Sequence, residues 1–385
     1  MAVYYVDGSV TSASGSGSGT IGDPWVKTDD LIQYAFGQIN AIGTGATGDT
    51  IIVLAGPLTN TSQLDPRVWD NSVNGSGYPL WVKTTGPTVT IDWDCGGTTF
   101  CHYPFQGIKF AGFRFYNYTS SGSTYPFTMW RYCDFINCIF DSYAQTHYGL
   151  ISQPSGLNFW TGCSFINDNR DNLGNSNRGL LYSGNSIFYN NYVETLSTNG
   201  TPTYSINFNS MHIVNNIFYN ESDNSTYAYR WSQGAKCSNN TFYNGGPSQN
   251  CIYNTAANNI GPIDNNYFEG WNFGFQTSMT NRVVNEWIVG NKGYNNSGGL
   301  LSSNLVENVS SPFDFQDSYF KNETLSESGL VDPANKDFTP KDLLLGSGFS
   351  TLAKGTSGYG NNYQNVGAVV THLTPEIPIP KRVRG

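Results

Sequence analysis

The stretch Asn215–Asn220 reads NNIFYN, and close variants of it recur along the chain. Asn185–Asn190 reads NSIFYN, Asn239–Asn244 reads NNTFYN and Asn265–Gly270 reads NNYFEG. With the aromatic residue of each phrase taken as an anchor, the repeat has a period of about 24 residues. The anchors are Phe115, Phe140, Phe165, Phe188, Phe218, Phe242 and Phe268, with Ile288 as a weaker eighth.

Each phrase alternates apolar and polar residues and ends in Asn, Ser or Gly, which predicts a short strand followed by a tight turn. A repeat of this length without a helical pattern excludes a βαβ unit. The sequence therefore predicts an all-β fold, a single-stranded parallel β-helix with about 24 residues per coil. Anchor rings should stack inside it, and asparagines should bond along the turns. A β-sandwich or propeller is the alternative, but neither fold repeats one short motif with this period.

The two ends of the chain differ from the repeat. Thr28–Ile42 begins with an N-cap threonine and predicts an amphipathic helix that covers the open end of the solenoid. Gly48–Gly56 and Thr88–Asp94 are interpreted as the first strands. We expect a cap region over 1–50, β-helix coils over 51–300, irregular coils with a closing strand over 301–372, and an extended Pro/basic tail over 373–385.

Composition excludes several classes of protein. The net charge is −9, with no basic block before the last few residues, so we expect no nucleic-acid partner. No apolar run approaches the roughly 20 residues of a membrane span, and the first residues lack the features of a secretory leader. The seven cysteines include no CxxC pair. Cys138 and Cys163 share one place in the repeat, which favours stacked, reduced core residues over disulfides or a zinc site.

Two runs of the sequence resemble a known superfamily. The opening run YYVDGSV…GDPWVKTDDLIQYAF…GDTIIVLAG looks like the start of the pectate-lyase-like β-helices, and the closing run KDFTPKDLLLGSGFSTLAKG…NVGAV looks like their end. The resemblance covers nearly the whole chain and implies a right-handed parallel β-helix. It does not select a function, because this superfamily includes lyases, hydrolases, epimerases, adhesins and phage tailspikes.

The residue after each inward anchor should point outward, because side chains alternate along a strand. Tyr189, Tyr219 and Tyr243 are then three stacked tyrosines on an outer face. Flat amphipathic rings in a row suit a polysaccharide, so these are candidate carbohydrate-binding residues. Two alternatives stay open: the rings lie beneath an overlying loop, or they lie in the interface of a homotrimer.

The search for catalytic and metal-binding residues gives one candidate pair. Asp141 and Glu269 share an outer face but stand five coils apart, about 24 Å, whereas a glycosidase pair needs about 10 Å or less. Asp171 and Glu194 occupy matching positions after their anchors on adjacent coils, and they are the candidate catalytic pair. The polar stretch 167–178 lacks the spacing of a calcium loop. We expect no metal site and no cofactor, with Ca²⁺ as an alternative that no clear motif supports.

These features favour a phage or virion-associated β-helix: a tailspike, fibre or head-decoration protein located in the virion. Its expected partner is host-surface carbohydrate or a neighbouring virion subunit, and a homotrimer is a candidate assembly. The first alternative is a polysaccharide lyase or glycoside hydrolase, a depolymerase of extracellular polysaccharide. The second is a secreted, extracellular bacterial adhesin.

Overall fold

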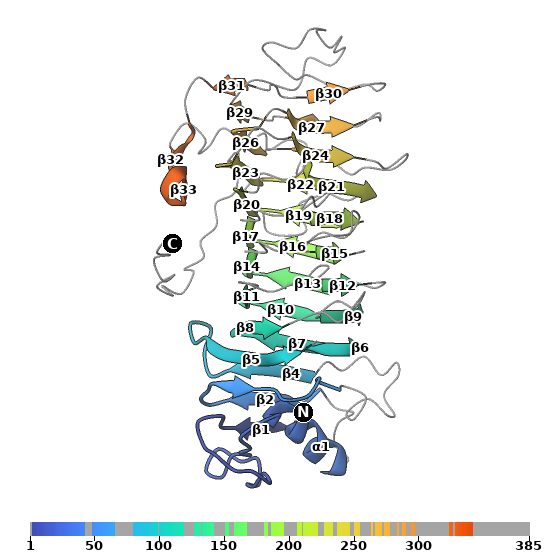
Figure 1. Cartoon of the computed structure of the whole chain (residues 1–385), viewed down its shortest axis with the longest axis vertical. Coiled ribbons are helices and arrows are strands. Elements are labelled where there is room, and N and C mark those ends of the chain that lie inside the picture. The colour runs from blue at the N-terminus through green and yellow to red at the C-terminus, as the bar shows by residue number, and fades with distance from the viewer. Residues whose placement is uncertain are drawn as a thin grey trace.

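A computed structural model shows the chain as a parallel β-helix, an elongated column with three parallel sheets along its axis (Figure 1). This confirms the fold class predicted from the repeat. The structure describes residues 2–42, 48–65, 80–98, 100–118, 127–131, 133–141, 151–153, 158–167, 181–183, 186–195, 206–209, 211–221, 227–233, 237–246, 250–254, 263–264, 266–271, 273–277, 283–284, 287–289, 294–296, 323–325 and 328–341. The predicted tail over 373–385 lies outside these residues.

Successive coils add one strand to each sheet, and neighbouring strands pair in parallel. The first sheet contains β1 (Val3–Val6), β2 (Thr50–Val53), β4 (Leu80–Thr84), β7 (Ile108–Ala111), β10 (Asp134–Ile136), β13 (Asn158–Thr161), β16 (Ser186–Tyr189), β19 (His212–Val214), β22 (Cys237–Ser238), β25 (Ile263–Asp264) and β28 (Val283–Val284). It begins at β1, within the segment expected to form the cap.

The second and third sheets are built the same way. The second contains β3 (Leu58–Thr59), β5 (Ile91–Thr98), β8 (Phe113–Tyr118), β11 (Ile139–Asp141), β14 (Ser164–Asn167), β17 (Tyr192–Thr195), β20 (Ile217–Asn220), β23 (Thr241–Asn244), β26 (Tyr267–Glu269), β29 (Trp287–Val289) and β31 (Glu323–Leu325). The third contains β6 (Cys101–Gln106), β9 (Phe127–Arg131), β12 (Ile151–Gln153), β15 (Leu181–Ser183), β18 (Ile206–Asn209), β21 (Tyr227–Gln233), β24 (Asn250–Asn254), β27 (Phe273–Thr277) and β30 (Tyr294–Asn296).

The anchor rings of the second sheet form a stack inside the column. The ring centroids of Phe140 and Phe165 are 4.9 Å apart, and those of Phe218 and Phe242 are 4.8 Å apart. These distances follow from the spacing of about 4.8 Å between neighbouring strands. The predicted internal stack is therefore confirmed. The fully buried residues at the anchor position of the second sheet include Phe115, Phe140, Phe165, Val193, Phe218, Phe242 and Phe268.

The phrase at Asn185–Asn190 departs from the predicted register. Phe188 lies in β16 of the first sheet, where it pairs with Trp160 and Ile213. The second-sheet member of this coil is Val193, which aligns with the anchors before and after it. The interpretation of Phe188 as the anchor of this coil was therefore wrong by one strand.

The Phe188 ring nevertheless enters the internal stack. Its centroid lies 5.4 Å from that of Phe165 and 6.2 Å from that of Phe218. The valine at position 193 is smaller than a phenylalanine and leaves space between these two rings. Phe188 fills that space from the neighbouring sheet, which keeps the core close-packed.

The paired asparagines form the corner between the first and second sheets. Asn215 has a φ of 56°, a left-handed conformation that Asn and Gly adopt more readily than other residues. Asn216 is buried, and its Nδ2 donates to Oδ1 of Asn240 at 3.0 Å. Oδ1 of Asn216 accepts the backbone N–H of Asn191 at 2.8 Å. Because equivalent residues of neighbouring coils are joined, this ladder holds the coils in register.

Cysteines take the place of the ladder asparagines in earlier coils. Cys138 and Cys163 both stand two positions before an anchor, and both are buried and free. The Sγ of Cys163 lies 3.4 Å from the carbonyl oxygen of Phe135. Burial raises the pKa of the Cys163 thiol well above its ordinary value, which keeps it protonated. The prediction of reduced core cysteines is confirmed at these positions.

Helix α1 (Leu31–Ile42) covers the N-terminal end of the column (Figure 1). Leu31, Ala35 and Ile39 are buried in the same core cluster as the first strands. This confirms the predicted capping helix. Ile42, the last residue of the helix, is 52% exposed because it lies beyond the edge of the core.

The predicted N-cap residue of α1 was wrong. The helix begins after Asp30 rather than after Thr28, and the Asp30 carbonyl accepts the first helical hydrogen bond from Tyr34 at 2.9 Å. The Asp30 carboxylate accepts the backbone N–H groups of Thr61 and Ser62 at 2.9 and 3.0 Å. The Thr61 hydroxyl donates to the other carboxylate oxygen at 2.8 Å. Burial opposes ionisation, but the hydrogen bonds from the Thr61 hydroxyl and from the two backbone N–H groups outweigh it and lower the pKa of Asp30. The aspartate thus ties the helix to the segment after β3.

A two-stranded antiparallel hairpin lies beside the column (Figure 1). It consists of β32 (Leu330–Asp332), a one-turn 3-10 helix (Pro333–Asn335) and β33 (Asp337–Pro340). The run KDFTP, part of the closing run quoted above, supplies β33. We call the segment 328–341 the strap.

Candidate functional site

The outer face of the second sheet carries a column of tyrosines and carboxylates. Each member directly follows an inward anchor, so its side chain points away from the core. Neighbours pair across adjacent strands, as Glu194 does with Tyr219 and Tyr219 with Tyr243. From β5 to β26 this outer column reads Asp94, Tyr116, Asp141, Ile166, Glu194, Tyr219, Tyr243 and Glu269.

Two of the three predicted tyrosines lie together. The rings of Tyr219 and Tyr243 are 5.8 Å apart between centroids and inclined by 16°. Tyr189 lies elsewhere, in β16 of the first sheet, where it pairs with Thr161 and Val214. The predicted column of three tyrosines is therefore wrong at Tyr189, because the residue before it is inward on the first sheet and not on the second.

Glu194 occupies the place in the outer column that was predicted for Tyr189. It lies in strand β17, directly after Val193, and not in a loop. Its expected partner Asp171 lies outside the described residues. The catalytic pair of Asp171 and Glu194 stays a prediction.

The strap lies across β17, β20 and β23, on top of the tyrosines. The ring of Phe338 contacts those of Tyr192, Tyr219 and Tyr243, with centroid distances of 6.1, 5.5 and 5.7 Å. Phe338 is 6% exposed and Tyr219 only 1% exposed. This part of the outer column therefore lies beneath a segment of the same chain.

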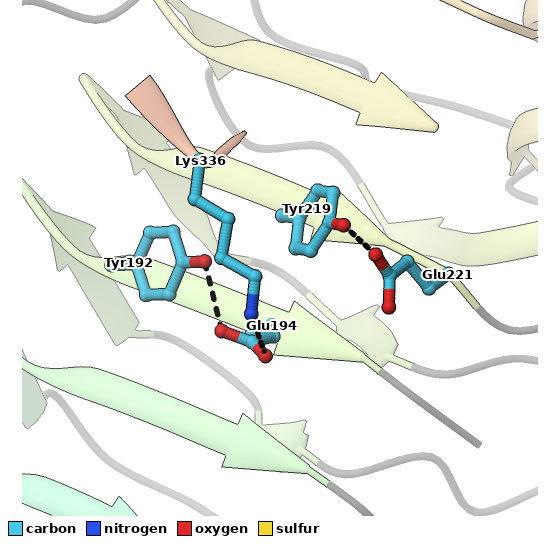
Figure 2. Close-up of polar contacts among 5 residues, drawn as sticks. All are labelled: Tyr192, Glu194, Tyr219, Glu221 and Lys336. Atoms are coloured by element: carbon cyan, nitrogen blue, oxygen red, sulfur yellow. Dashed lines mark hydrogen bonds and ion pairs between the residues drawn. The ribbon is translucent and has the colours of Figure 1, made fainter. Parts of the chain in front are cut away.

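Glu194 is the polar centre of this contact (Figure 2). Its Oε1 accepts a hydrogen bond from Lys336 Nζ at 2.7 Å, and its Oε2 accepts one from Tyr192 Oη at 2.9 Å. Nζ of Lys336 also lies over the ring of Tyr219, 5.3 Å from its centroid. Because both carboxylate oxygens hold donors, Glu194 is here a bound counter-ion rather than a free base or nucleophile.

Tyrosine–glutamate hydrogen bonds recur along this face. Burial raises the pKa of Tyr192 well above its ordinary value, and the charge of Glu194 raises it further. Burial and Glu269 do the same to the pKa of Tyr267. Both phenols therefore stay neutral and act as donors to their carboxylates. Among the residues that the structure describes, these pairs are Tyr192–Glu194, Tyr219–Glu221 and Tyr267–Glu269.

A second cluster lies on β5, β8 and β11, away from the strap. Nη2 of Arg114 donates to Oδ2 of Asp141 at 2.7 Å, and Nη1 lies 3.6 Å from Oδ2 of Asp92. The guanidinium lies over the ring of Tyr116, 5.5 Å from its centroid. Burial opposes the charge on Arg114, but Asp141 and Asp92 outweigh it and raise its pKa, so the group stays cationic. We call these four residues the open patch, since the Asp92 side chain is 48% exposed.

The open patch has the chemistry of a polar binding surface. A guanidinium and carboxylates make directional hydrogen bonds, and a tyrosine offers a flat apolar face beside them. Burial and the charge of Asp94 raise the pKa of Tyr116, which keeps its hydroxyl a neutral donor. This combination suits a ligand with many hydroxyl groups and flat ring faces.

Sequence reasoning did not identify Arg114, Lys336 or Phe338. Arg114 and Tyr116 flank the anchor Phe115, and this outward–inward–outward pattern is the signal from which both could have been identified. Lys336 stands 142 residues after Glu194 in the chain and follows no period. No local pattern in the sequence connects these two residues.

No three His, Cys, Asp or Glu side chains in the described part of the chain come together as metal ligands. The alternative of bound Ca²⁺ thus gains no ligand set among these residues. Within the same part, no helix has the length and apolar character needed to cross a membrane.

Comparison of the chain with protein-family models, with curated proteins and with solved structures gave no match. The resemblance to the pectate-lyase-like superfamily therefore rests on the two quoted runs. At the level that the structure shows, the chain is a parallel β-helix.

Proposed function

We propose that this chain is a virion-associated β-helix protein of the tailspike, fibre or head-decoration type. In this proposal it binds carbohydrate on the surface of a host cell along the outer face of its second sheet. The observation that carries the proposal is the open patch: a half-buried guanidinium, carboxylates and a tyrosine ring held on three adjacent strands. Side chains fixed on a sheet lose little conformational freedom on binding, which favours recognition of a weakly apolar ligand.

The state of Glu194 favours binding over catalysis on this face. A general acid, base or nucleophile needs access to the substrate, whereas both oxygens of Glu194 bond to donors of the same chain. Its side chain is 3% exposed. The depolymerase alternative thus depends on opening of the strap or on other residues.

The cysteines favour a virion protein over a secreted adhesin. The six cysteines whose side chains are described are all buried, and no disulfide joins any two of them. Proteins that fold in oxidising compartments more often pair their cysteines, and free thiols are usual where folding takes place inside a reducing cell. A virion protein is assembled in such an environment.

The carbohydrate proposal is tested by binding of purified capsular polysaccharide and lipopolysaccharide from a panel of bacteria. Tyr116→Ala and Arg114→Ala should each weaken binding about five-fold, as expected for loss of one ring contact or one charge-assisted contact. Tyr189→Ala is the matched control, because it removes a partly buried outward tyrosine from the first sheet. Melting curves of all three variants check that the fold is kept.

Two results would contradict the proposal: binding that survives both open-patch changes, or a loss confined to Tyr189→Ala. Cleavage of a bound polysaccharide would favour the depolymerase, and its abolition by Asp171→Asn or Glu194→Gln would assign the catalytic pair. Virion location is tested separately, by mass spectrometry of purified phage particles. Absence from particles, with recovery from a bacterial culture medium, would favour the adhesin.

A further inference from the structure

The strap places one cation and one ring on the outer face of the second sheet. Lys336 reaches Glu194, and Phe338 lies against the tyrosine rings. The strap's other contacts with this face are made near its start, where Ser328 Oγ donates to Glu269 Oε2 at 2.7 Å. The strap therefore contacts this face through few groups.

The carboxylate of Glu194 requires a cation at this place. Glu194 is buried, with 3% of its side chain exposed, and one of its oxygens accepts a hydrogen bond from Tyr192. A buried carboxylate without a partner is strongly unfavourable. Lys336 approaches from the solvent side, with 34% of its side chain exposed. The other lysine of the strap, Lys341, instead donates its Nζ to the carbonyl of Ser328 at 2.9 Å.

The rings beside Glu194 complete the site. Tyr219 lies under the ammonium group of Lys336 at 5.3 Å, which is a cation–π distance. Tyr219 and Tyr243 are stacked along the axis, and Phe338 lies against both of them. Carboxylate, donor and stacked rings together form a subsite for a primary ammonium attached to a flat, compact group.

The strap is built so that it can leave without dismantling the column. Its two strands pair with each other and form a sheet separate from the three long ones. Its displacement therefore breaks no ladder of the solenoid. Lys336 itself has a φ of 66°, a left-handed conformation that is costly for a lysine. A ligand with its own ammonium group would supply the cation that the buried Glu194 carboxylate needs. Lys336 would then be free to leave its strained backbone conformation.

We propose that Lys336 and Phe338 occupy the place of a ligand, and that the covered face binds a polysaccharide with free amino groups once the strap is displaced. The ammonium of the sugar replaces that of Lys336 at Glu194, and the sugar ring replaces Phe338 on Tyr219 and Tyr243. The ammonium subsite stands on the contacts above. Only the identification of its bearer as a polysaccharide rests on the proposed function.

The charge of the outer column supports an amino polymer over an acidic one. Its carboxylates recur along the axis at Asp94, Asp141, Glu194 and Glu269. Asp141 is already paired with Arg114, whereas Lys336 pairs with Glu194 only while the strap is closed. A polymer that carries amino groups at intervals presents opposite charge along this line, whereas uronic acids are repelled. Tyr219 and Tyr243 lie on neighbouring strands along the axis, so a chain of sugars that contacts both rings runs in the same direction.

The ammonium subsite is tested by chemical rescue. Lys336→Ala removes the cation and leaves the Glu194 carboxylate, so the melting temperature should fall. Ethylammonium chloride should restore it with saturation, while sodium chloride and tetramethylammonium chloride at equal concentration should not. The double variant Lys336→Ala with Glu194→Gln should show no rescue, and Lys341→Ala is the matched lysine control. Equal effects of all three salts on Lys336→Ala would overturn the subsite.

The ligand class is tested with oligomers of glucosamine and of N-acetylglucosamine, which differ in the charge of the amino group. Lys336→Ala should bind the glucosamine oligomer at least ten-fold more tightly than the acetylated one, and more tightly than the unchanged protein does. Equal binding of both oligomers would overturn the charge selectivity and leave the proposed carbohydrate function standing. Ammonium rescue without binding of either oligomer would overturn the sugar as ligand and count against that function, while the subsite itself would stand.

Discussion

Four positions of NNIFYN have distinct physical roles in the structure. Asn215 supplies the left-handed turn, and Asn216 joins the buried amide ladder. Phe218 enters the ring stack, while Tyr219 faces outward under the strap. This six-residue motif thus supplies a turn, a hydrogen-bond ladder, a core contact and a surface contact.

The ladder predicts unequal costs for its two asparagines. Asn216→Ala should lower the free energy of unfolding by about 3 kcal/mol, because it leaves buried partners such as the N–H of Asn191 unsatisfied. Asn215→Gly should cost less than about 1 kcal/mol, since glycine adopts the same positive φ. Denaturant unfolding of both variants measures the difference. Similar losses at the two positions would contradict the assigned roles.

Buried tyrosines predict a loss of stability at alkaline pH. The pKa of Tyr267 is raised in the folded protein above its ordinary value of about 10, mainly by burial. The folded state therefore keeps a proton that the unfolded chain releases above pH 10. Stability from this group is present below that pH and falls by up to about 1.4 kcal/mol per pH unit above it.

Tyr267→Phe should flatten this alkaline decline, although it also removes the hydrogen bond to Glu269. Urea unfolding between pH 8 and pH 11 measures the slope for both proteins. A slope that is the same with and without the hydroxyl would rule out this tyrosine as a source of the decline.

At the level of elements, the strap differs from the strands of the second sheet that it contacts. Those strands are held by backbone hydrogen bonds to the neighbouring strands on both sides, whereas the strap is held to the sheet mainly by side chains. The hydrogen bond from the Gly329 N–H to Tyr267 Oη, at 2.6 Å, is one of its few backbone contacts with the sheet. The strap should therefore open before the solenoid unfolds.

Phe338→Ala should open the strap while leaving the column folded. The ring is almost fully buried, and its loss should destabilise closure by about 3 kcal/mol. Hydrogen exchange should become faster over 329–341 and stay unchanged in β2 and β4. Thr339→Ala, an exposed neighbour, serves as the control. Faster exchange throughout the column would instead make the strap part of the global unfolding unit.

The whole molecule is a stack in which each coil contacts its neighbours. Stability of such a solenoid is approximately a sum over coils and the interfaces between them. The ring stack follows this pattern, because Phe165 contacts Phe140 of the coil before it and Phe188 of the next coil. A core change should therefore act locally along the axis.

Phe165→Ala should cost about 4 kcal/mol and should loosen mainly the coils on either side of it. Hydrogen exchange should accelerate in β11 and β17 and remain slow in β2. Tyr189→Ala, an outward change on a nearby coil, should leave exchange in the core unaltered. A uniform acceleration from β2 to β26 would show that the column unfolds as one cooperative unit.

Periodic features of this molecule could be predicted from the sequence, and its single contacts could not. The stack of Phe140, Phe165 and Phe218 and the corner at Asn215 recur at one place in the repeat, so spacing alone reveals them. The error at Phe188 arose because this coil carries an aromatic residue in the first sheet and Val193 in the second. A pattern of apolar residues does not distinguish two inward strands of one coil.

The sequence by itself determined the parallel β-helix, its capping helix, its reduced core cysteines and the outward direction of Tyr219 and Tyr243. These follow from local propensities and from contacts between equivalent residues, which repeat and therefore leave a periodic trace. Only the tertiary structure decided that the strap covers these tyrosines and that Lys336 neutralises Glu194 across 142 residues. Such a contact occurs once in the molecule and depends on how distant segments pack together. It therefore leaves no periodic pattern in the sequence from which it could be predicted.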